Sequence, residues 1–159
     1  MVVPKTRPTL AVARQKAEQY CAYQERSHLE VETKLRNMGL LSGEIADVLL
    51  HLIEHNFLNE ERFAIAFATG KHKVLGWGRK KIIYHLKQKG INNKLIEIAI
   101  KNIPEDDYTT TLQELIEKKD RMLKETDAFA RAAKVTRYLL QKGFESDQVY
   151  VAVKKYFKS

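Results

Sequence analysis

The chain has 159 residues, of which 44% are hydrophobic and 30% charged, with only seven glycines and three prolines. This apolar share supports a core and excludes general disorder, and the scarcity of turn residues favours long helices over many short strands. A single cysteine excludes an internal disulfide, and no apolar run approaches the roughly 18 residues of a membrane span.

The first nine residues contain two of the three prolines and no apolar run of signal-peptide length. We therefore expect residues 1–9 to form an N-terminal tail on a cytoplasmic protein without a membrane anchor. Cys21 stands among small and aromatic neighbours, which is typical of a buried filler residue.

The net charge of +8 is concentrated in the middle third of the chain. Residues 59–103 hold ten Lys or Arg and three Asp or Glu, giving +7, whereas residues 1–58 are neutral and residues 104–159 carry +1. An acidic partner is therefore expected at the middle of the chain.

An internal repeat centres on three glycines spaced 51 and 53 residues apart, Gly39, Gly90 and Gly143. Each has a leucine four residues earlier, a β-branched residue eight residues earlier and a large apolar residue directly after it. Glycine accepts the left-handed conformation that ends a helix, so each motif predicts a helix that stops at the glycine.

A second helix is predicted after each glycine. Three residues further on stands a good N-cap, and apolar residues then follow at 6, 9, 10 and 13 positions past the glycine, which is one face of a helix. The expected N-caps are Ser42, Asn93 and Ser146.

A further helix precedes each pair, at roughly 10–24, 60–73 and 106–126, with Asn59 as the N-cap of the middle one. The expected inner face of this middle helix is Phe63, Ala66, Phe67 and Gly70. The fold predicted is all-α: three tandem three-helix, helix-turn-helix-like repeats in an elongated, curved arrangement. The repeats span 10–58, 59–104 (the basic one) and 105–159.

Several motifs of the chain resemble those of the RecX family of recombination regulators. They are the run from Arg26 to Leu35, the stretch FLNEERFA from Phe57 and the stretch GWGRKKI from Gly76, followed by LKQKGI from Leu86 and KGF from Lys142. The resemblance covers roughly residues 11–157, in order and at the family's spacing. Arg79 stands where many members have proline, which still permits a helix to begin there.

The resemblance implies a function and a set of partners. Members of this family resemble modulators of RecA that lie along the groove of the RecA–DNA filament, contact protein and DNA together, and usually suppress strand exchange and co-protease activity. For this chain the resemblance implies a regulator of recombination and repair, with the RecA filament and single- and double-stranded DNA as partners, acting as a monomer.

The stretch from Gly70 to Gly90 holds seven Lys or Arg and no acidic residue. Lysines there can neutralise phosphates and an aromatic ring can stack on a base, although a solvated helix face explains the same pattern. Trp77, between two glycines, fits either an interface anchor or a plug between helices. The predicted DNA- or filament-binding residues are Lys71, Lys73, Trp77, Arg79, Lys80, Lys81, Tyr84 and Lys87.

One motif points instead to an enzyme. The run from His51 to His55 matches the H-x-x-E-H pattern of inverted zinc peptidases, whose two histidines share a helix face. The equivalent helices of the other repeats lack it, and Leu49 and Leu52 assign the inner face elsewhere, so both histidines are expected to face solvent. We therefore expect no metal, no cofactor and no catalytic activity.

A different class of binding protein remains open from the residues alone. A stand-alone tandem helix-turn-helix DNA-binding protein would share this architecture, but it needs base-reading Arg, Asn or Gln on its recognition helices. The third helices of this chain offer mostly Lys, Glu and Asp, which suit phosphate contact and solvation.

Overall fold

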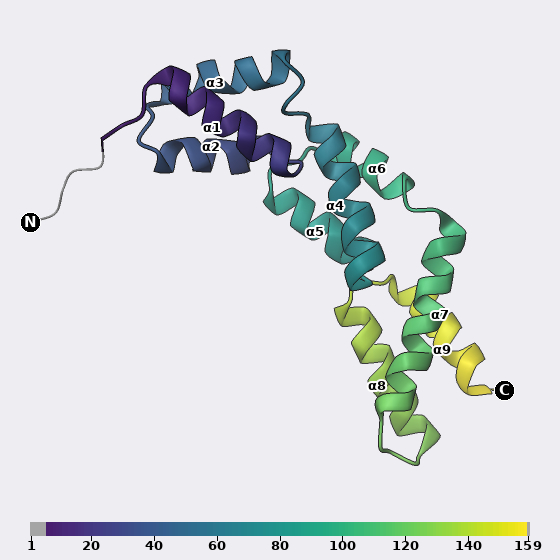
Figure 1. Ribbon diagram of the computed structural model, residues 1–159. Coiled ribbons are helices and arrows are strands. Elements are labelled where there is room, and N and C mark those ends of the chain that lie inside the picture. Colours follow the sequence, from purple (N-terminus) through teal and green to yellow (C-terminus); the bar gives the residue numbers. More distant parts are fainter. Residues whose placement is uncertain (1–5, 159) are drawn as a thin grey trace, which may run out of the picture.

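A computed structural model describes residues 6–158, and over this range the chain forms nine α-helices and no strand (Figure 1). The all-α prediction is confirmed. Residues 1–5 of the expected tail lie outside the described residues. The helices are α1 (Leu10–Tyr23), α2 (His28–Asn37), α3 (Ser42–Glu54), α4 (Glu60–Leu75), α5 (Arg79–Gln88), α6 (Asn93–Lys101), α7 (Glu105–Met122), α8 (Ala128–Gln141) and α9 (Ser146–Lys158).

The helices contact one another mainly within consecutive groups of three, α1–α3, α4–α6 and α7–α9. Figure 1 shows these three bundles following one another along a bent path. The second helices, α2, α5 and α8, lie on the inner side of the bend, and the third helices, α3, α6 and α9, lie on the outer side.

The repeat glycines end their helices as the sequence predicts. Gly39, Gly90 and Gly143 have φ of +94°, +78° and +96°, a region that favours glycine. The residue after each glycine is buried, and its N–H donates to the carbonyl of the leucine five residues earlier, at 3.1–3.2 Å. These bonds run from Leu40 to Leu35, from Ile91 to Leu86 and from Phe144 to Leu139.

The predicted N-caps of the third helices are wrong by one residue. Ser42, Asn93 and Ser146 are the first helical residues. Asn92 caps α6 by accepting from the Leu95 N–H at 2.9 Å, and Leu41 precedes α3 without a side-chain cap. In all three repeats the third helix already begins at the third residue past the glycine. The N-cap position is therefore the second residue past the glycine.

Two first helices also differ from expectation. On α4 the buried residues are Phe63, Ala64, Ala68 and His72, whereas Ala66 is exposed. The buried face of α4 therefore keeps Phe63 from the predicted inner face, and Ala64, Ala68 and His72 complete it. Helix α7 ends at Met122, four residues short of the predicted end, and it buries Tyr108, Leu112, Ile116 and Asp120.

Burial divides the chain into two cores. One lies within α1–α3, and the other runs through α4–α9, so the second and third repeats share a core. They meet at a seam where the Gly78 N–H donates to the Lys142 carbonyl at 2.7 Å and the Lys80 N–H donates to the Gly143 carbonyl at 2.9 Å. Within residues 6–158 no helix has both the length and the apolar content needed to cross a bilayer.

Candidate nucleic-acid interface

The structure gathers aromatic and basic side chains around Trp77, in the short connection between α4 and α5. Its backbone is held by His72, whose buried Nδ1–H donates to the Trp77 carbonyl at 2.9 Å. The ring centroids of His85 and Trp77 lie 4.6 Å apart. The ammonium groups of Lys71 and Lys81 lie 5.3 and 4.6 Å from the Trp77 ring centroid. Trp77 is thus half-buried and flanked by cations, and its role as an interface anchor stays a prediction.

The electrostatics of this cluster are visible at His85. Partial burial lowers its pKa, and the ammonium groups of Lys81, Lys71 and Lys89 lower it further. Three positive charges therefore act together on one imidazole, and a bound anion would relieve their repulsion.

A second group of predicted residues forms a stripe along α5. Lys80, Tyr84 and Lys87 are all exposed and recur at intervals of four and three residues, so they share one face of the helix. Tyr84 is 60% exposed, and its ring meets His85 edge-on at a centroid distance of 5.4 Å. The stripe therefore adjoins the Trp77 cluster.

Arg79 lies elsewhere. Its guanidinium binds Glu145 at 2.8 Å and also pairs with Glu105, and it stacks 3.7 Å from the ring centroid of Tyr108. Burial alone would lower the pKa of Arg79, but the hydrogen bond and charge of Glu145 outweigh burial and raise it. With its side chain only 15% exposed, Arg79 holds the second and third repeats together.

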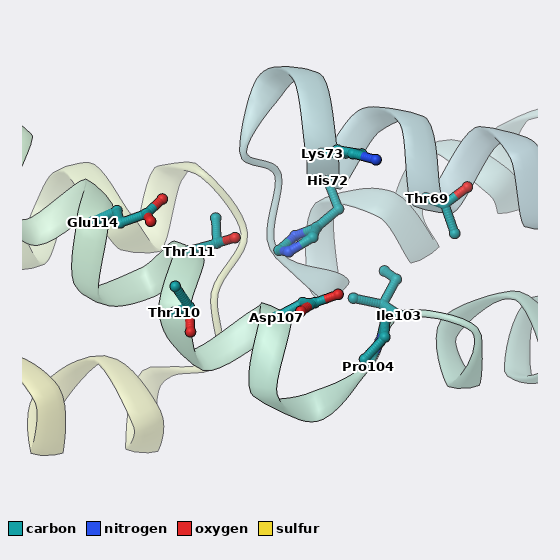
Figure 2. Close-up of a pocket in the computed structure, with 9 residues that line it drawn as sticks. All are labelled: Thr69, His72, Lys73, Ile103, Pro104, Asp107, Thr110, Thr111 and Glu114. Carbon is teal, nitrogen blue, oxygen red and sulfur yellow. The ribbon is translucent and has the colours of Figure 1, made fainter.

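Lys73 is also separated from the cluster. It projects from the side of α4 away from Lys71, where a pocket of about 530 Å³ lies between α4 and α7. Figure 2 shows Lys73 with Thr69 and His72 on one wall of that pocket and with Asp107 across from them. The structure therefore brings together six of the eight predicted residues and places Arg79 and Lys73 apart.

The sequence reasoning missed several members of the cluster. His85 and Lys89 follow Lys81 at intervals of four residues, which places all three on one face of the helix. This spacing could have identified both residues from the sequence. The contact of Phe67 with Trp77, at a centroid distance of 6.2 Å, and the support from His72 depend on tertiary packing and had no local signal.

The two histidines of the H-x-x-E-H motif do not form a metal-binding pair with a third ligand in the described residues. His51 was expected to face solvent, but it is partly buried and its Nε2 lies 2.7 Å from Oε1 of Glu18 on α1. His55 is exposed. Across residues 6–158 no group of three or more His, Cys, Asp or Glu side chains is arranged to hold a metal.

The single cysteine, Cys21, is buried as expected. Burial raises the pKa of the Cys21 thiol to about 11, which keeps it protonated and unreactive.

Taken together, the helices form a tandem three-helix repeat whose middle repeat places lysines beside aromatic rings. Comparison with known proteins agrees with this class. The family models for the second and third three-helix domains of RecX match residues 59–100 and 105–153. The chain belongs to the RecX family.

Individual relatives support the same assignment. Over 120 residues, 74% of the chain, it is 33% identical to the regulatory protein RecX of Clostridium perfringens strain 13, and over 88% of the chain it is 27% identical to that of Bacillus licheniformis. The chain spans about half the length of these relatives, 56% and 53%. The crystal structure of RecX from Lactobacillus salivarius has the same fold, with a TM-score of 0.82, 24% identity and coverage of 92% of this chain and 95% of that one.

Proposed function

We propose that this protein binds the RecA–DNA filament and inhibits strand exchange, ATP turnover and co-protease activity, without catalysis of its own. The observation that carries the proposal is the Trp77 cluster, in which lysines converge on an aromatic ring in the repeat that holds most of the net charge. Membership of a family of regulatory proteins named RecX supports the choice of partner. We further propose a cytoplasmic monomer, since the partner is the filament on DNA.

The geometry fits a binder of an extended partner. Three bundles in a bent row reach further than a compact domain of the same size (Figure 1). Several weak contacts along a filament then add through effective concentration. In this arrangement the basic middle repeat lies nearest the DNA, and the outer repeats contact filament protein.

The deciding experiment is a titration of the full chain into RecA on single-stranded DNA while ATP hydrolysis is measured. We expect hydrolysis to fall at protein concentrations below that of RecA. The triple variant Lys80→Gln, Lys81→Gln and Lys87→Gln should inhibit less, whereas Lys94→Gln, an exposed change on the outer side of the same repeat, should inhibit like wild type.

A stand-alone DNA-binding protein is the competing function. It predicts that the full chain binds free DNA tightly but leaves ATP hydrolysis by RecA unchanged at every ratio. That result would remove the proposed function.

A further inference from the structure

Each three-helix repeat contains at least one aromatic ring that is faced by two cations. We name these groups the first, second and third ring clusters. The first is Tyr20 with Arg26 and Lys34, the second is Trp77 with Lys71 and Lys81, and the third is Tyr138 with Lys119 and Lys142. The charged atoms lie 3.7 and 5.4 Å, 5.3 and 4.6 Å, and 4.9 and 5.9 Å from the respective ring centroids.

The three ring clusters occupy the same place in their repeats. Each lies between the first and second helix, with Tyr20 from α1, Lys71 from α4 and Lys119 from α7. Each also includes or touches the residue five positions before the repeat glycine. These residues are Lys34, His85 (against Trp77) and Tyr138.

Neighbouring ring clusters also adjoin one another. Tyr20 and His85 line one pocket of about 420 Å³ between the first and second repeats. Across the seam, the Lys142 ammonium donates to the Leu75 carbonyl at the end of α4. Burial lowers the pKa of Lys142, and the charges of Lys81 and Lys118 lower it further, so positive charge continues from the second repeat to the third.

None of the six cations forms an ion pair with a carboxylate of residues 6–158. Elsewhere arginines at comparable depth are paired, such as Arg62 with Glu25 at 3.0 Å and Arg131 with Asp120 at 2.6 Å. The ring-cluster cations are instead positioned by aromatic faces and, for Arg26 and Lys142, also by the backbone carbonyls of Tyr20 and Leu75, so their charge remains available for an external anion.

From this arrangement we propose that the protein binds a single nucleic-acid strand along the face formed by the first and second helices of its three repeats, with one ring cluster contacting the phosphates in each repeat. The rings are already faced by cations, so they orient the cations for phosphate contact and do not read bases. Binding is therefore independent of sequence and strongly dependent on salt. The inference extends the DNA-contacting part of the proposed function from the middle repeat to all three.

The test measures binding of the full chain to a fluorescent thymidine homopolymer long enough to pass all three repeats, at several salt concentrations. The variants are Lys34→Gln for the first ring cluster, Lys71→Gln with Lys81→Gln for the second, and Lys119→Gln with Lys142→Gln for the third. The matched control is Lys94→Gln with Lys154→Gln, two exposed residues on the outer helices α6 and α9.

Each double ring-cluster variant should bind about ten-fold more weakly at low salt and lower the slope of log K against log salt by about 1.4, because each phosphate contact on a single strand contributes about 0.7. Lys34→Gln should lower the slope by about 0.7. The control should keep a slope close to that of wild type. Lys142→Arg retains the charge and should bind like wild type, which separates loss of charge from damage to the seam.

Three results would overturn the inference. If the third ring-cluster variant keeps the wild-type slope while the second loses it, binding is confined to the middle repeat and the proposed function survives alone. Equal losses in the control would show that only net charge matters. Poly-glutamate that displaces the oligomer as well as an equal charge of thymidine homopolymer would show a general site for acidic chains. Conversely, a protein with the expected slopes that leaves RecA unaffected retains this inference and loses the proposed function.

Discussion

Gly78 and Gly143 meet backbone to backbone across the seam between the second and third repeats. A Cβ added to Gly78 would lie 2.3 Å from the Gly143 carbonyl carbon, and one added to Gly143 would lie 2.4 Å from the Lys81 Cβ. The glycine that ends α8 thus also receives the start of α5. Glycine at position 78 is required by this close approach, since its own φ of −79° suits any residue.

Gly78→Ala should therefore open or strain the seam. Because backbone atoms block the new methyl group, we expect the free energy of unfolding to fall by about 2 kcal/mol, the usual cost of overpacking. Urea denaturation followed by circular dichroism measures this change.

Gly70→Ala is the matched control. A Cβ at Gly70, inside α4, meets no atom within 4 Å, so alanine should stabilise the helix by about 0.5–1 kcal/mol. A Gly78→Ala protein as stable as wild type would show that the two repeats are not docked through this contact.

Arg79 and Lys80 are adjacent in sequence and should behave in opposite ways. Arg79→Gln leaves Glu145 without its cationic partner in a poorly exposed site, where the Tyr108 hydroxyl still donates to it, so we expect a loss of about 2 kcal/mol in the free energy of unfolding. Lys80→Gln changes an exposed residue and should alter stability by less than about 0.5 kcal/mol while weakening DNA binding.

Parallel urea denaturation and DNA-binding assays on the two variants check this division. If Arg79→Gln weakens DNA binding more than Lys80→Gln and leaves stability intact, Arg79 belongs to the binding surface and its pairing with Glu145 is incidental.

Asp120 makes the third repeat sensitive to acid. It is 8% exposed, and it accepts from the Arg131 guanidinium at 2.6 Å and from the Tyr156 hydroxyl at 2.7 Å. Burial alone would raise its pKa, but the hydrogen bonds of Tyr156 and Arg131 outweigh burial and lower it. The folded state therefore holds the proton less tightly than the unfolded state, and this stabilisation is present near neutral pH and lost as pH falls below the ordinary value of 3.8.

Asp120→Asn should lose about 2 kcal/mol near neutral pH and little further on acidification to about pH 3, unlike wild type. Urea denaturation at the two pH values gives both differences. The control is Asp47→Asn, an exposed residue on α3 that should retain the wild-type pH dependence. Identical acid sensitivity in Asp120→Asn and wild type would place the titrating group elsewhere.

The helices and turns of this fold were predictable because the residues that determine them lie only a few positions apart in the sequence. The glycine motif fixes where a helix stops, and the apolar period that follows fixes which side of the next helix is buried. Asn59 caps α4 as expected, accepting from the Arg62 N–H at 3.0 Å. The residues that carry these signals contact neighbours only a few positions away.

The candidate site was less predictable because its members are sorted by tertiary contacts. The pairing of Arg79 with Glu145 joins residues 66 positions apart and removes a residue that looked like part of the basic face. Lys71 and Lys73 are two residues apart on α4 and therefore point to opposite sides. A buried histidine, His72, sets the position of Trp77, and composition gives no sign of that contact.

His85 provides a direct report on whether phosphate reaches the Trp77 cluster. In the free protein its pKa is lowered by partial burial and by the charges of Lys81, Lys71 and Lys89. A phosphate among these lysines would offset their repulsion and raise the pKa of His85, so DNA binding must take up protons. Affinity for DNA should therefore increase by about two- to ten-fold as pH falls from about 8 to about 6 at constant ionic strength. Fluorescence anisotropy over this range measures the affinity, and the ring resonances of His85 report its titration with and without DNA.

His85→Gln should bind DNA with a flatter pH dependence, whereas His55→Gln, an exposed change in the first repeat, should keep the wild-type dependence. If the pKa of His85 is the same in free and bound protein, phosphate does not enter the cluster, and the DNA must instead bind along Lys80, Tyr84 and Lys87 on α5.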